Sequence, residues 1–385
     1  MWSIVRILLS SLVSAGVHLY VWARLVRPMR PGRLRRGLGI AIAVLFVAVP
    51  VTTSARLWAP SLSAELGWPS QTWLAFVGLA AVLLLAIDLA RLVARLVRAV
   101  ARRPAPLPER AMSRRRFLAG TVATVAGASV ARGVLEARGA HELVDVEVPL
   151  AKLPRALDGF TIVQLSDLHT GMTIDRAFVQ RVVDRANALA PDLLALTGDL
   201  VDGPVEALAD DVAPLAQLRA RHGVFAVTGN HEYYAGVDAW IAAISRLGVR
   251  YLRNERVTIG EGAASFELAG VDDHDAARFP GHGEDLPAAT AGRDPSRALV
   301  LLAHQPRQVR HAAKYGVDLQ LSGHTHGGQI WPWHYVVRLQ QGGLLAGRYE
   351  HEGTQLYVSR GCGYWGPPVR LFAPLEITRV ILRAA

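Results

Sequence analysis

Almost uniformly apolar stretches dominate the first quarter of the chain. They cover residues 4–23, 37–53 and 73–87, and the third continues past Asp88 to Leu89. A hydrocarbon core of about 30 Å is crossed by roughly 20 helical residues, so each stretch has about the required length. The second is short enough to be a buried helix of a soluble protein, but three such stretches close together favour a membrane bundle. We therefore predict a transmembrane helical region of about three spans over residues 1–98.

The arginines around these stretches predict the orientation of the bundle. Only Arg56 lies between the second and third stretches, whereas arginines crowd the other two flanks. The two groups are Arg24, Arg27, Arg30, Arg33, Arg35 and Arg36, and Arg91, Arg95, Arg98, Arg102, Arg103 and Arg110. Cytoplasmic loops carry an excess of basic residues, so both groups are expected in the cytoplasm. The N-terminus is then outside, and the chain is back in the cytoplasm by residue 91.

Two ionisable residues fall inside or at the end of these stretches, His18 and Asp88. Such residues can mark a functional site in a membrane. A structural role is favoured for both residues. His18 is expected to be a lone histidine packed inside the helix bundle, and the Asp88 carboxylate is expected to extend towards the membrane interface beside Arg91.

Residues 99–143 are predicted to be a basic, Pro-rich linker followed by a second membrane-related element. The linker prolines lie within 104–108, and Ser113-Arg114-Arg115-Arg116-Phe117-Leu118 then resembles a twin-arginine export signal with 118–131 as its apolar region. The alternative is an ordinary basic membrane flank. Ser129-Val130-Ala131 fits a small-residue cleavage site, and an uncleaved fourth span fits the same segment equally well.

From residue 144 the pattern changes to short apolar strands that alternate with amphipathic helices. Strands are predicted over 160–165, 192–197, 223–227, 298–303 and 318–321, and helices over 174–189, 205–220, 237–247 and 307–315. This alternation predicts an α/β domain over residues 144–385, with sheets covered by helices in layers.

Polar clusters follow the carboxyl ends of five of these strands. The clusters are Ser166–Asp167–Leu168–His169, Gly198–Asp199–Leu200–Val201–Asp202, Gly229–Asn230–His231–Glu232, Ala303–His304–Gln305–Pro306 and Gly323–His324–Thr325–His326–Gly327–Gly328. In open α/β sheets ligands bind at this edge. Each cluster alone would be an unremarkable turn, but five in order point to one shared site.

The residue types in these clusters favour metal-assisted chemistry. In Asp-x-His and His-x-His, two side chains on the same side of an extended segment can reach one ion. Carboxylate, amide oxygen and imidazole without thiolate suit Mn²⁺, Fe or Zn²⁺. One carboxylate can bridge two such ions, which together activate a water and hold a phosphoryl group.

Read in order, the five clusters resemble the calcineurin-like metallophosphoesterase family, and in particular its bacterial membrane-associated branch typified by YaeI and YkuE. The late segment Arg370-Leu371-Phe372-Ala373-Pro374-Leu375-Glu376-Ile377 carries part of that resemblance. The resemblance implies a four-layer sandwich, two sheets flanked by helices. It implies one metal held by Asp167, His169, Asp199 and His326, and a second held by Asp199, Asn230, His304 and His324. His231 would be the acid that assists the leaving group, oriented by Asp202.

Charge and cysteine content remove several other classes of protein. Residues 1–116 carry 17 arginines, no lysine and three acids, which makes +14; the whole chain carries +10, so residues 117–385 carry −4. A nucleic-acid-binding surface or a nuclease is therefore not expected in the α/β domain. The single cysteine, Cys362, excludes an intramolecular disulfide and a Cys-rich metal site, and is expected to be a small buried residue.

The remaining candidate residues are expected to be structural. Seven histidines match no motif, namely His141, His222, His274, His282, His311, His334 and His351. The polar stretch 274–286 could form a loop on the substrate side. Trp331, Trp333 and Trp365 could face a lipid or ligand, but packing in the core is the default expectation.

Together these patterns predict a membrane-anchored two-metal phosphoesterase that works through a metal-bridging hydroxide. Mn²⁺ is the first choice of metal from the resemblance, followed by Fe or Zn²⁺. The expected location is the cytoplasmic membrane, multi-pass, with the catalytic domain on the outer face. The expected partners are the lipid bilayer and a phosphorylated small molecule or lipid, with a phosphodiester or pyrophosphate of an envelope lipid preferred. The alternative is a non-catalytic membrane sensor that binds a phosphorylated ligand.

Overall fold

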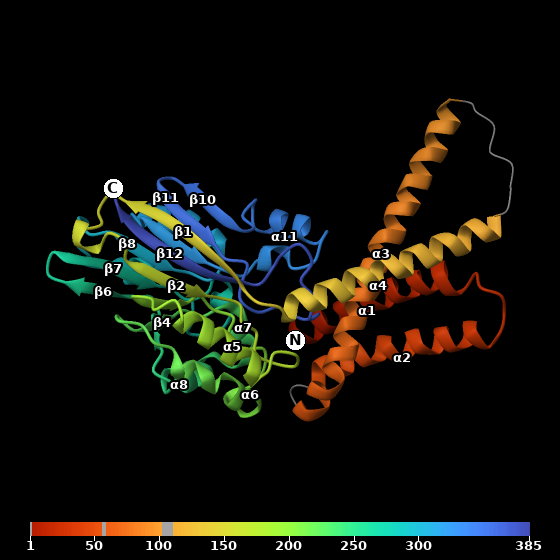
Figure 1. The fold of residues 1–385 in the computed structure, drawn as a ribbon, viewed down its shortest axis with the longest axis horizontal. Helices are drawn as coiled ribbons and strands as arrows, with labels where there is room; N and C mark the ends of the chain where they lie inside the picture. Colours follow the sequence, from red (N-terminus) through yellow and green to blue (C-terminus); the bar gives the residue numbers. More distant parts are fainter. Residues whose placement is uncertain (1, 56–58, 102–110) are drawn as a thin grey trace. The chain divides into compact units, whose positions relative to one another are not determined.

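The computed structural model describes residues 2–55, 59–101 and 111–385 (Figure 1), and it divides the chain into two compact units, residues 1–134 and 135–385. The division falls within a helix, α4 (Ala111–Arg138). The predicted Pro-rich linker at 104–108 and Arg56 lie outside the described residues, and the side chains of Arg114 and Arg115 are not described.

The first unit consists of helices. These are α1 (Trp2–Val21), which continues into a π-helical turn (Trp22–Val26), α2 (Arg33–Ala55), α3 (Pro60–Val100) and most of α4. Segments Arg33–Ala55, Glu65–Val100 and Arg116–Arg138 are long and apolar enough to cross a membrane, and Ser11–Val26 is a shorter apolar helix. The prediction of apolar helices that could span a bilayer is confirmed, and α4 contains one of them.

Hydrogen bonds within and between helices satisfy the side chains of His18 and Asp88. The indole nitrogen of Trp73 donates to His18 Nε2 at 2.9 Å, and His18 Nδ1 lies 2.7 Å from the Ser14 carbonyl. Asp88 accepts from Tyr20 at 2.8 Å and pairs with Arg24, while Arg91 is more distant at 3.5 Å. These contacts give His18 and Asp88 structural partners, and Asp88 is tied to α1 more closely than to Arg91.

The second unit contains two six-stranded mixed sheets. The first has the order β1-β12-β2-β3-β4-β5 and the second β10-β11-β9-β8-β7-β6. The strands are β1 (Glu142–Leu150), β2 (Thr161–Leu165), β3 (Leu193–Leu196), β4 (Val224–Ala226), β5 (Arg250–Tyr251), β6 (Glu255–Glu261), β7 (Ala264–Gly270), β8 (Leu299–Leu302), β9 (Leu319–Ser322), β10 (Gly347–His351), β11 (Thr354–Val358) and β12 (Glu376–Ala384). Within the first sheet β2, β3, β4 and β5 are parallel, and within the second β7, β8, β9 and β11 are parallel.

Alternation along the strands builds the layers. In β3, Leu193 and Ala195 join the core between the two sheets, whereas Leu194 and Leu196 join the core under the helices of the first sheet. β8 shows the same alternation on the second sheet. Since successive side chains of a strand point to opposite faces, each central strand is buried on both sides. This explains why these strands are continuous apolar runs, and it confirms the predicted α/β sandwich.

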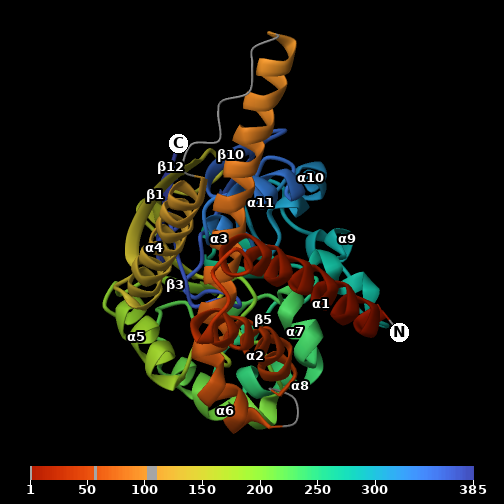
Figure 2. The same cartoon turned by 90° about the vertical axis from the view of Figure 1, so that its right-hand side faces the viewer.

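Helices cover the outer face of each sheet. The first sheet is covered by α5 (Arg176–Asn187), α6 (Val205–Val212) and α8 (Val237–Ser245), and the second by the short helices α9 (Leu286–Thr290) and α10 (Val309–Ala312). Figure 2 labels α5 and α6 on the side away from α9 and α10. The side chain of Asp175 caps α5 by accepting from the Phe178 amide at 2.9 Å.

Two predicted helices are shorter than expected. The helix predicted over 205–220 ends at Val212 and continues as a 3₁₀ turn over Ala213–Gln217. Pro214 has no amide hydrogen and its ring clashes with the preceding helical turn, so the α-helix cannot run through it. The segment predicted as a helix over 307–315 is one turn of α-helix between two 3₁₀ turns.

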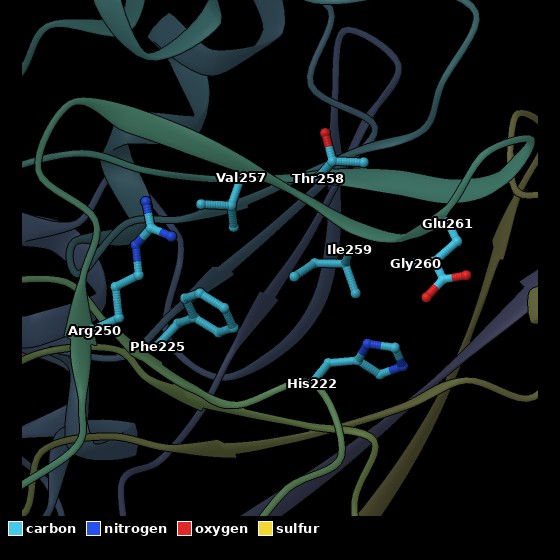
Figure 3. Close-up of a pocket in the computed structure, with 8 residues that line it drawn as sticks. All are labelled: His222, Phe225, Arg250, Val257, Thr258, Ile259, Gly260 and Glu261. Atoms are coloured by element: carbon cyan, nitrogen blue, oxygen red, sulfur yellow. The ribbon is translucent and has the colours of Figure 1, made fainter.

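A cavity of about 240 Å³ lies at the amino ends of β4 and β5, away from the polar clusters. His222, Phe225 and Arg250 line one wall, and the β6 segment 257–261 lines the other. Figure 3 shows Val257 and Ile259 on the β6 side, facing Phe225. None of the predicted site residues lines this cavity.

The core between the sheets gives the first prediction, on stability. Phe266 of β7 is fully buried there, with its ring edge-on to Phe160 at a centroid distance of 5.2 Å. Phe266→Ala should lower the free energy of unfolding by about 3–5 kcal/mol because it leaves a cavity between rigid sheets. Urea unfolding of the detergent-solubilised chain, followed by near-ultraviolet circular dichroism, measures this loss.

The matched control is Phe372→Ala, at a side chain that is 71% exposed. It should change the unfolding free energy by no more than about 0.5 kcal/mol. An equal loss in both variants would contradict the assignment of the core.

Candidate metal centre

The two sheets bring the five polar clusters to one place. Asp167 and His169 follow β2, Asp199 and Asp202 follow β3, and the Asn230–His231 pair follows β4. His304 follows β8, and His324 and His326 follow β9 on the second sheet. Because β2, β3, β4, β8 and β9 each end in a cluster, the site lies where the carboxyl ends of both sheets meet.

The backbone at this site is held in an uncommon conformation. Five of the predicted ligands have a positive φ, between 52° and 72°: Asp167, His169, Asp199, His324 and His326. Few residues other than glycine adopt this conformation, and such strain collects at functional sites. The surrounding structure therefore fixes the direction in which these side chains leave the chain.

Two glycines allow the loops to approach one another closely. A methyl group on Gly229 would overlap the Asp199 carboxylate, and one on Gly323 would overlap the side chains of Ser166 and Asp167. A side chain at either glycine would collide with a predicted metal ligand or its neighbour, so both positions require glycine.

The first group of predicted ligands surrounds a space that fits one cation. His169 Nε2 and His326 Nε2 lie 3.0 Å apart, His326 Nε2 lies 3.6 Å from Asp167 Oδ1, and His169 Nε2 lies 3.7 Å from Asp199 Oδ2. Two imidazole nitrogens at this distance need a proton or a cation between them. Burial and the charge of His169 hold the pKa of His326 well below its usual range, so its ring is neutral, as a metal ligand requires.

The second group meets the first at Asp199. His304 Nε2 lies 3.0 Å from Asp199 Oδ2 and 3.2 Å from His324 Nδ1. Burial and the charge of His304 lower the pKa of His324 to about 3. Asn230 is buried, and its amide oxygen has no hydrogen-bond partner among the described residues, which fits a ligand oxygen aimed at a cation. The donor set thus fits two cations that share Asp199.

Asp202 contacts two histidines through one oxygen. Its Oδ1 lies 2.6 Å from His231 Nδ1 and 2.9 Å from His169 Nδ1. Burial alone would raise the pKa of Asp202, but the charges of His169 and His231 hold it well below its usual range. The sequence predicted the contact with His231 only; in addition Asp202 fixes the ring of His169, a predicted metal ligand.

His231 is arranged to carry a proton. Burial would lower its pKa, but Asp199 and Asp202 outweigh burial and raise the pKa of His231 to about 9. Its Nδ1 is taken by Asp202, and its side chain is only partly buried. The remaining nitrogen, Nε2, is therefore the atom that can donate a proton to a bound group.

Glu232 belongs to the third polar cluster, but the sequence predicted no role for it. The Glu232 carboxylate is fully buried and accepts backbone hydrogen bonds from Gly229 at 2.6 Å, Leu200 at 2.6 Å and Asp199 at 3.0 Å. Burial and the Asp199 charge raise its pKa to about 7. Glu232 thus ties the loop after β3 to the loop after β4. An acid three residues after a glycine at a helix start is a capping signal that could have indicated this.

Arg370 is a second residue whose role was not predicted. Its guanidinium is fully buried and donates to the carbonyls of His326 at 2.8 Å, Ala373 at 3.2 Å and Gly363. Burial lowers its pKa to about 10. It holds the chain at His326 against the segment that follows β11. A lone arginine in an apolar run gave little indication of this contact.

The other candidates lie elsewhere. Among the described residues, the seven histidines without a motif belong to none of the metal-binding groups. Cys362 is buried as expected, and its thiol lies 3.1 Å from the Ser166 carbonyl. The expectation that Trp331, Trp333 and Trp365 pack in the core is wrong, because all three are exposed. Local sequence does not distinguish an apolar residue of the core from one on the surface.

Comparisons with known proteins agree with this geometry. The family profile described as calcineurin-like phosphoesterase matches residues 160–328. A cattle (Bos taurus) protein named transmembrane protein with metallophosphoesterase domain is 43% identical over 265 residues, 66% of this chain and 60% of its own length. The uncharacterized metallophosphoesterase YkuE of Bacillus subtilis (strain 168) is 31% identical over 71% of this chain and 98% of its own length. An uncharacterized metallophosphoesterase of Aquifex aeolicus is 38% identical over 60% of this chain and 88% of its own length.

Glu232 gives the second prediction. Glu232→Gln should weaken binding of divalent cations about 10–100-fold, because the variant has one oxygen and an NH₂ group where three backbone amides need acceptors. Isothermal titration calorimetry with Mn²⁺ measures the affinity of each variant for the cation. Glu350→Gln, at an exposed glutamate of β10, is the matched control and should bind as the parent does. Unchanged affinity in Glu232→Gln would refute the positioning role.

Proposed function

This chain belongs to the calcineurin-like metallophosphoesterase family, and from that premise we propose that it is a metal-dependent hydrolase of phosphate esters. The alignment spans 60% of the length of the cattle relative. The proposal therefore concerns the activity of this chain and not that of the whole cattle protein. The observation that carries the proposal is the position of Asp199. Its Oδ2 lies 3.7 Å from His169 Nε2 in the first group of ligands and 3.0 Å from His304 Nε2 in the second. A ligand set shared in this way is what a dinuclear phosphoesterase needs.

The residues divide into those that would hold cations and those that would move a proton. Asp167, His169, Asp199 and His326 would hold one cation, and Asp199, Asn230, His304 and His324 the other. When bound, such a pair of cations activates water and offsets the negative charge of a phosphoryl group. His231 would donate a proton from Nε2 to the leaving oxygen, while Asp202 keeps the ring oriented and charged.

We assign the cations to hard or borderline metals, with Mn²⁺ first and Fe or Zn²⁺ next. The donors are carboxylate, amide and imidazole groups, which suit these metals. Burial raises the pKa of the Cys362 thiol to about 12, so this cysteine does not offer a thiolate at neutral pH.

The proposed location is a bilayer, with the catalytic unit on the outer side of the cytoplasmic membrane. Among the described residues, three apolar helical segments lie in the first unit and a fourth, Arg116–Arg138, ends in the second; two relatives are named transmembrane proteins. The arginine distribution supports an outer N-terminus and a cytoplasmic segment after residue 91. Segment Arg116–Arg138 could then carry the chain outward, as a twin-arginine signal or as a fourth span.

The proposed substrate is a phosphodiester or pyrophosphate of an envelope lipid or its headgroup. Anchoring in the bilayer favours a substrate confined to the membrane over one that diffuses in solution. A panel of aryl monoesters, aryl diesters and lipid phosphoesters, assayed with the chain loaded separately with each metal, tests the class of substrate.

Asp199 gives the third prediction. Asp199→Asn removes the charge shared by the two cations, so metal content should fall below two ions per chain and hydrolysis of aryl esters should drop at least ~10³-fold. Mass-spectrometric metal analysis and the aryl ester assay are done on one preparation. Asp294→Asn, at an exposed aspartate, is the control and should keep both properties. A variant at Asp199 that keeps two tightly bound ions and most of its rate would overturn the assignment.

His231 gives the fourth prediction. Nitrophenolate leaves without help, whereas an alkoxide needs a proton. His231→Gln should therefore bind both cations normally and lose about 10-fold on aryl esters but on the order of 10²–10⁴-fold on alkyl esters. Rates on both substrates and metal content are measured together. His311→Gln, at an exposed histidine, is the matched control. Equal losses on the two substrates would make His231 a general electrostatic group, and loss of metal would make it structural.

The arginine distribution gives the fifth prediction. Reporter fusions after residues 30 and 105 should report the cytoplasm, and a fusion after residue 385 should report the outside. Replacing Arg114 and Arg115 with lysine should trap the catalytic unit inside if the segment is a twin-arginine signal. If the lysine variant still exposes the catalytic unit outside, the segment is an ordinary basic flank.

A further inference from the structure

The catalytic unit presents a set of large apolar side chains to solvent on one group of connected segments. Trp331 and Trp333 precede the helix α11 (His334–Gln340), in which no residue is buried. The exposed set, called here the aromatic surface, consists of Trp331, Trp333, Tyr335, Val336, Leu339, Trp365 and Phe372. Leu339 is 82% exposed and Trp333 59% exposed, so these side chains contribute little to the core. Apolar surface of this kind marks an interaction site.

The segments of the aromatic surface are bonded to one another. The Trp331 amide donates to the Leu371 carbonyl at 3.2 Å, and the Leu371 amide donates to the Gln329 carbonyl at 2.8 Å. The Gln329 side chain exchanges two hydrogen bonds with the Trp365 backbone, at 2.8 and 2.9 Å. Gln329 itself is buried and has a φ of 53°. The aromatic surface is therefore held in place by the fold and is not a set of unrelated loop tips.

The aromatic surface borders the metal centre. The rings of Trp365 and His231 lie edge to face with their centroids 6.0 Å apart. Gln329, which connects the segments, is three residues after His326. Whatever binds the aromatic surface therefore lies beside the group proposed to protonate the leaving oxygen.

The charge of these segments indicates the chemistry of the occupant. Segments 331–340 and 365–372, which carry the aromatic surface, contain no aspartate or glutamate, whereas Arg338 of α11 is exposed. Tryptophan and tyrosine prefer the lipid–water interface, and arginine is attracted to anionic headgroups. A surface that combines these residues and lacks carboxylates fits the interface of an anionic membrane.

We propose that the aromatic surface inserts into the interfacial region of the bilayer that the apolar helices of the same chain enter, so that lipid headgroups lie beside His231. The inference rests on the proposed function for two statements, that the apolar helices enter a bilayer and that a lipid phosphoester is the substrate. The exposed side chains and the charge pattern are independent of both. Docking of this kind would let a membrane-confined phosphoester reach the metal centre without leaving the bilayer.

Site-specific fluorescence on the full chain tests the contact directly. Leu339→Cys is labelled with the dye NBD, and the chain is reconstituted in vesicles of phosphatidylethanolamine and phosphatidylglycerol whose acyl chains are either plain or brominated. Cys362 is fully buried, so the parent chain should remain unlabelled and serves as the blank. Glu261→Cys is the matched control, because β6 is the sheet edge opposite to β10 and Glu261 is exposed.

Brominated lipid should quench the dye at position 339 at least three times more strongly than the dye at position 261. A second label, at Tyr335→Cys, should behave as the one at 339, which guards against a local defect in one variant. Equal quenching at all three positions, or none at 335 and 339, would overturn the proposal and leave a protein partner as the occupant. Quenching needs no turnover, whereas the aryl ester assay needs no membrane contact, so failure of docking and failure of the phosphoesterase function are separate results.

Discussion

The structure depends on keeping the Asp199 carboxylate charged while it is buried where the two sheets meet. Burial would raise the pKa of Asp199, but the charges of His304 and His231 hold it well below its usual range. An unpaired buried charge is costly, so cationic partners on both sides are a condition for this arrangement. The positive φ angles of the neighbouring ligands, the close approach at Gly229 and the Glu232 hydrogen bonds all place groups around this one carboxylate. The two sheets are the scaffold that brings histidines from β8 and β9 to it.

The sequence predicted the parts of the fold that depend on local pattern. The strands ending at Leu165, Leu196 and Leu302 are apolar runs that stop at polar residues, and such runs are recognisable without a partner. The pairing of β12 between β1 and β2 joins residues more than 200 positions apart, and local periodicity contains no information on it. The metal-centre residues could be listed because each follows a predicted strand. The capping position of Glu232 could have indicated its bond to Gly229, but not its bond to Leu200 in the loop after β3. Arg370 could not be assigned, because its role is hydrogen bonds to backbone groups of other segments. Exposure of Trp333 could not be predicted for a similar reason, since burial is decided by tertiary packing.

The two units pose different physical problems, and the proposals connect them. The helices of the first unit are apolar enough to enter lipid, so their apolar side chains need no protein core. The second unit instead buries its apolar side chains between the layers of the sandwich. The exception in the second unit is the aromatic surface, which lies next to His231. If that surface contacts lipid, then anchoring, access of substrate and proton donation are properties of adjacent residues, and membrane attachment selects the substrate as well as the location.

The central claim is that Asp199 joins two cations in one site. The most direct test is electron paramagnetic resonance of the wild-type chain loaded with Mn²⁺, with metal content measured on the same sample. Ions bridged by one carboxylate lie about 3.5–4 Å apart, which is close enough for their spins to couple. The account predicts two manganese ions per chain and the spectrum of an exchange-coupled pair. One ion per chain, or two ions with the spectrum of isolated Mn²⁺, would contradict it.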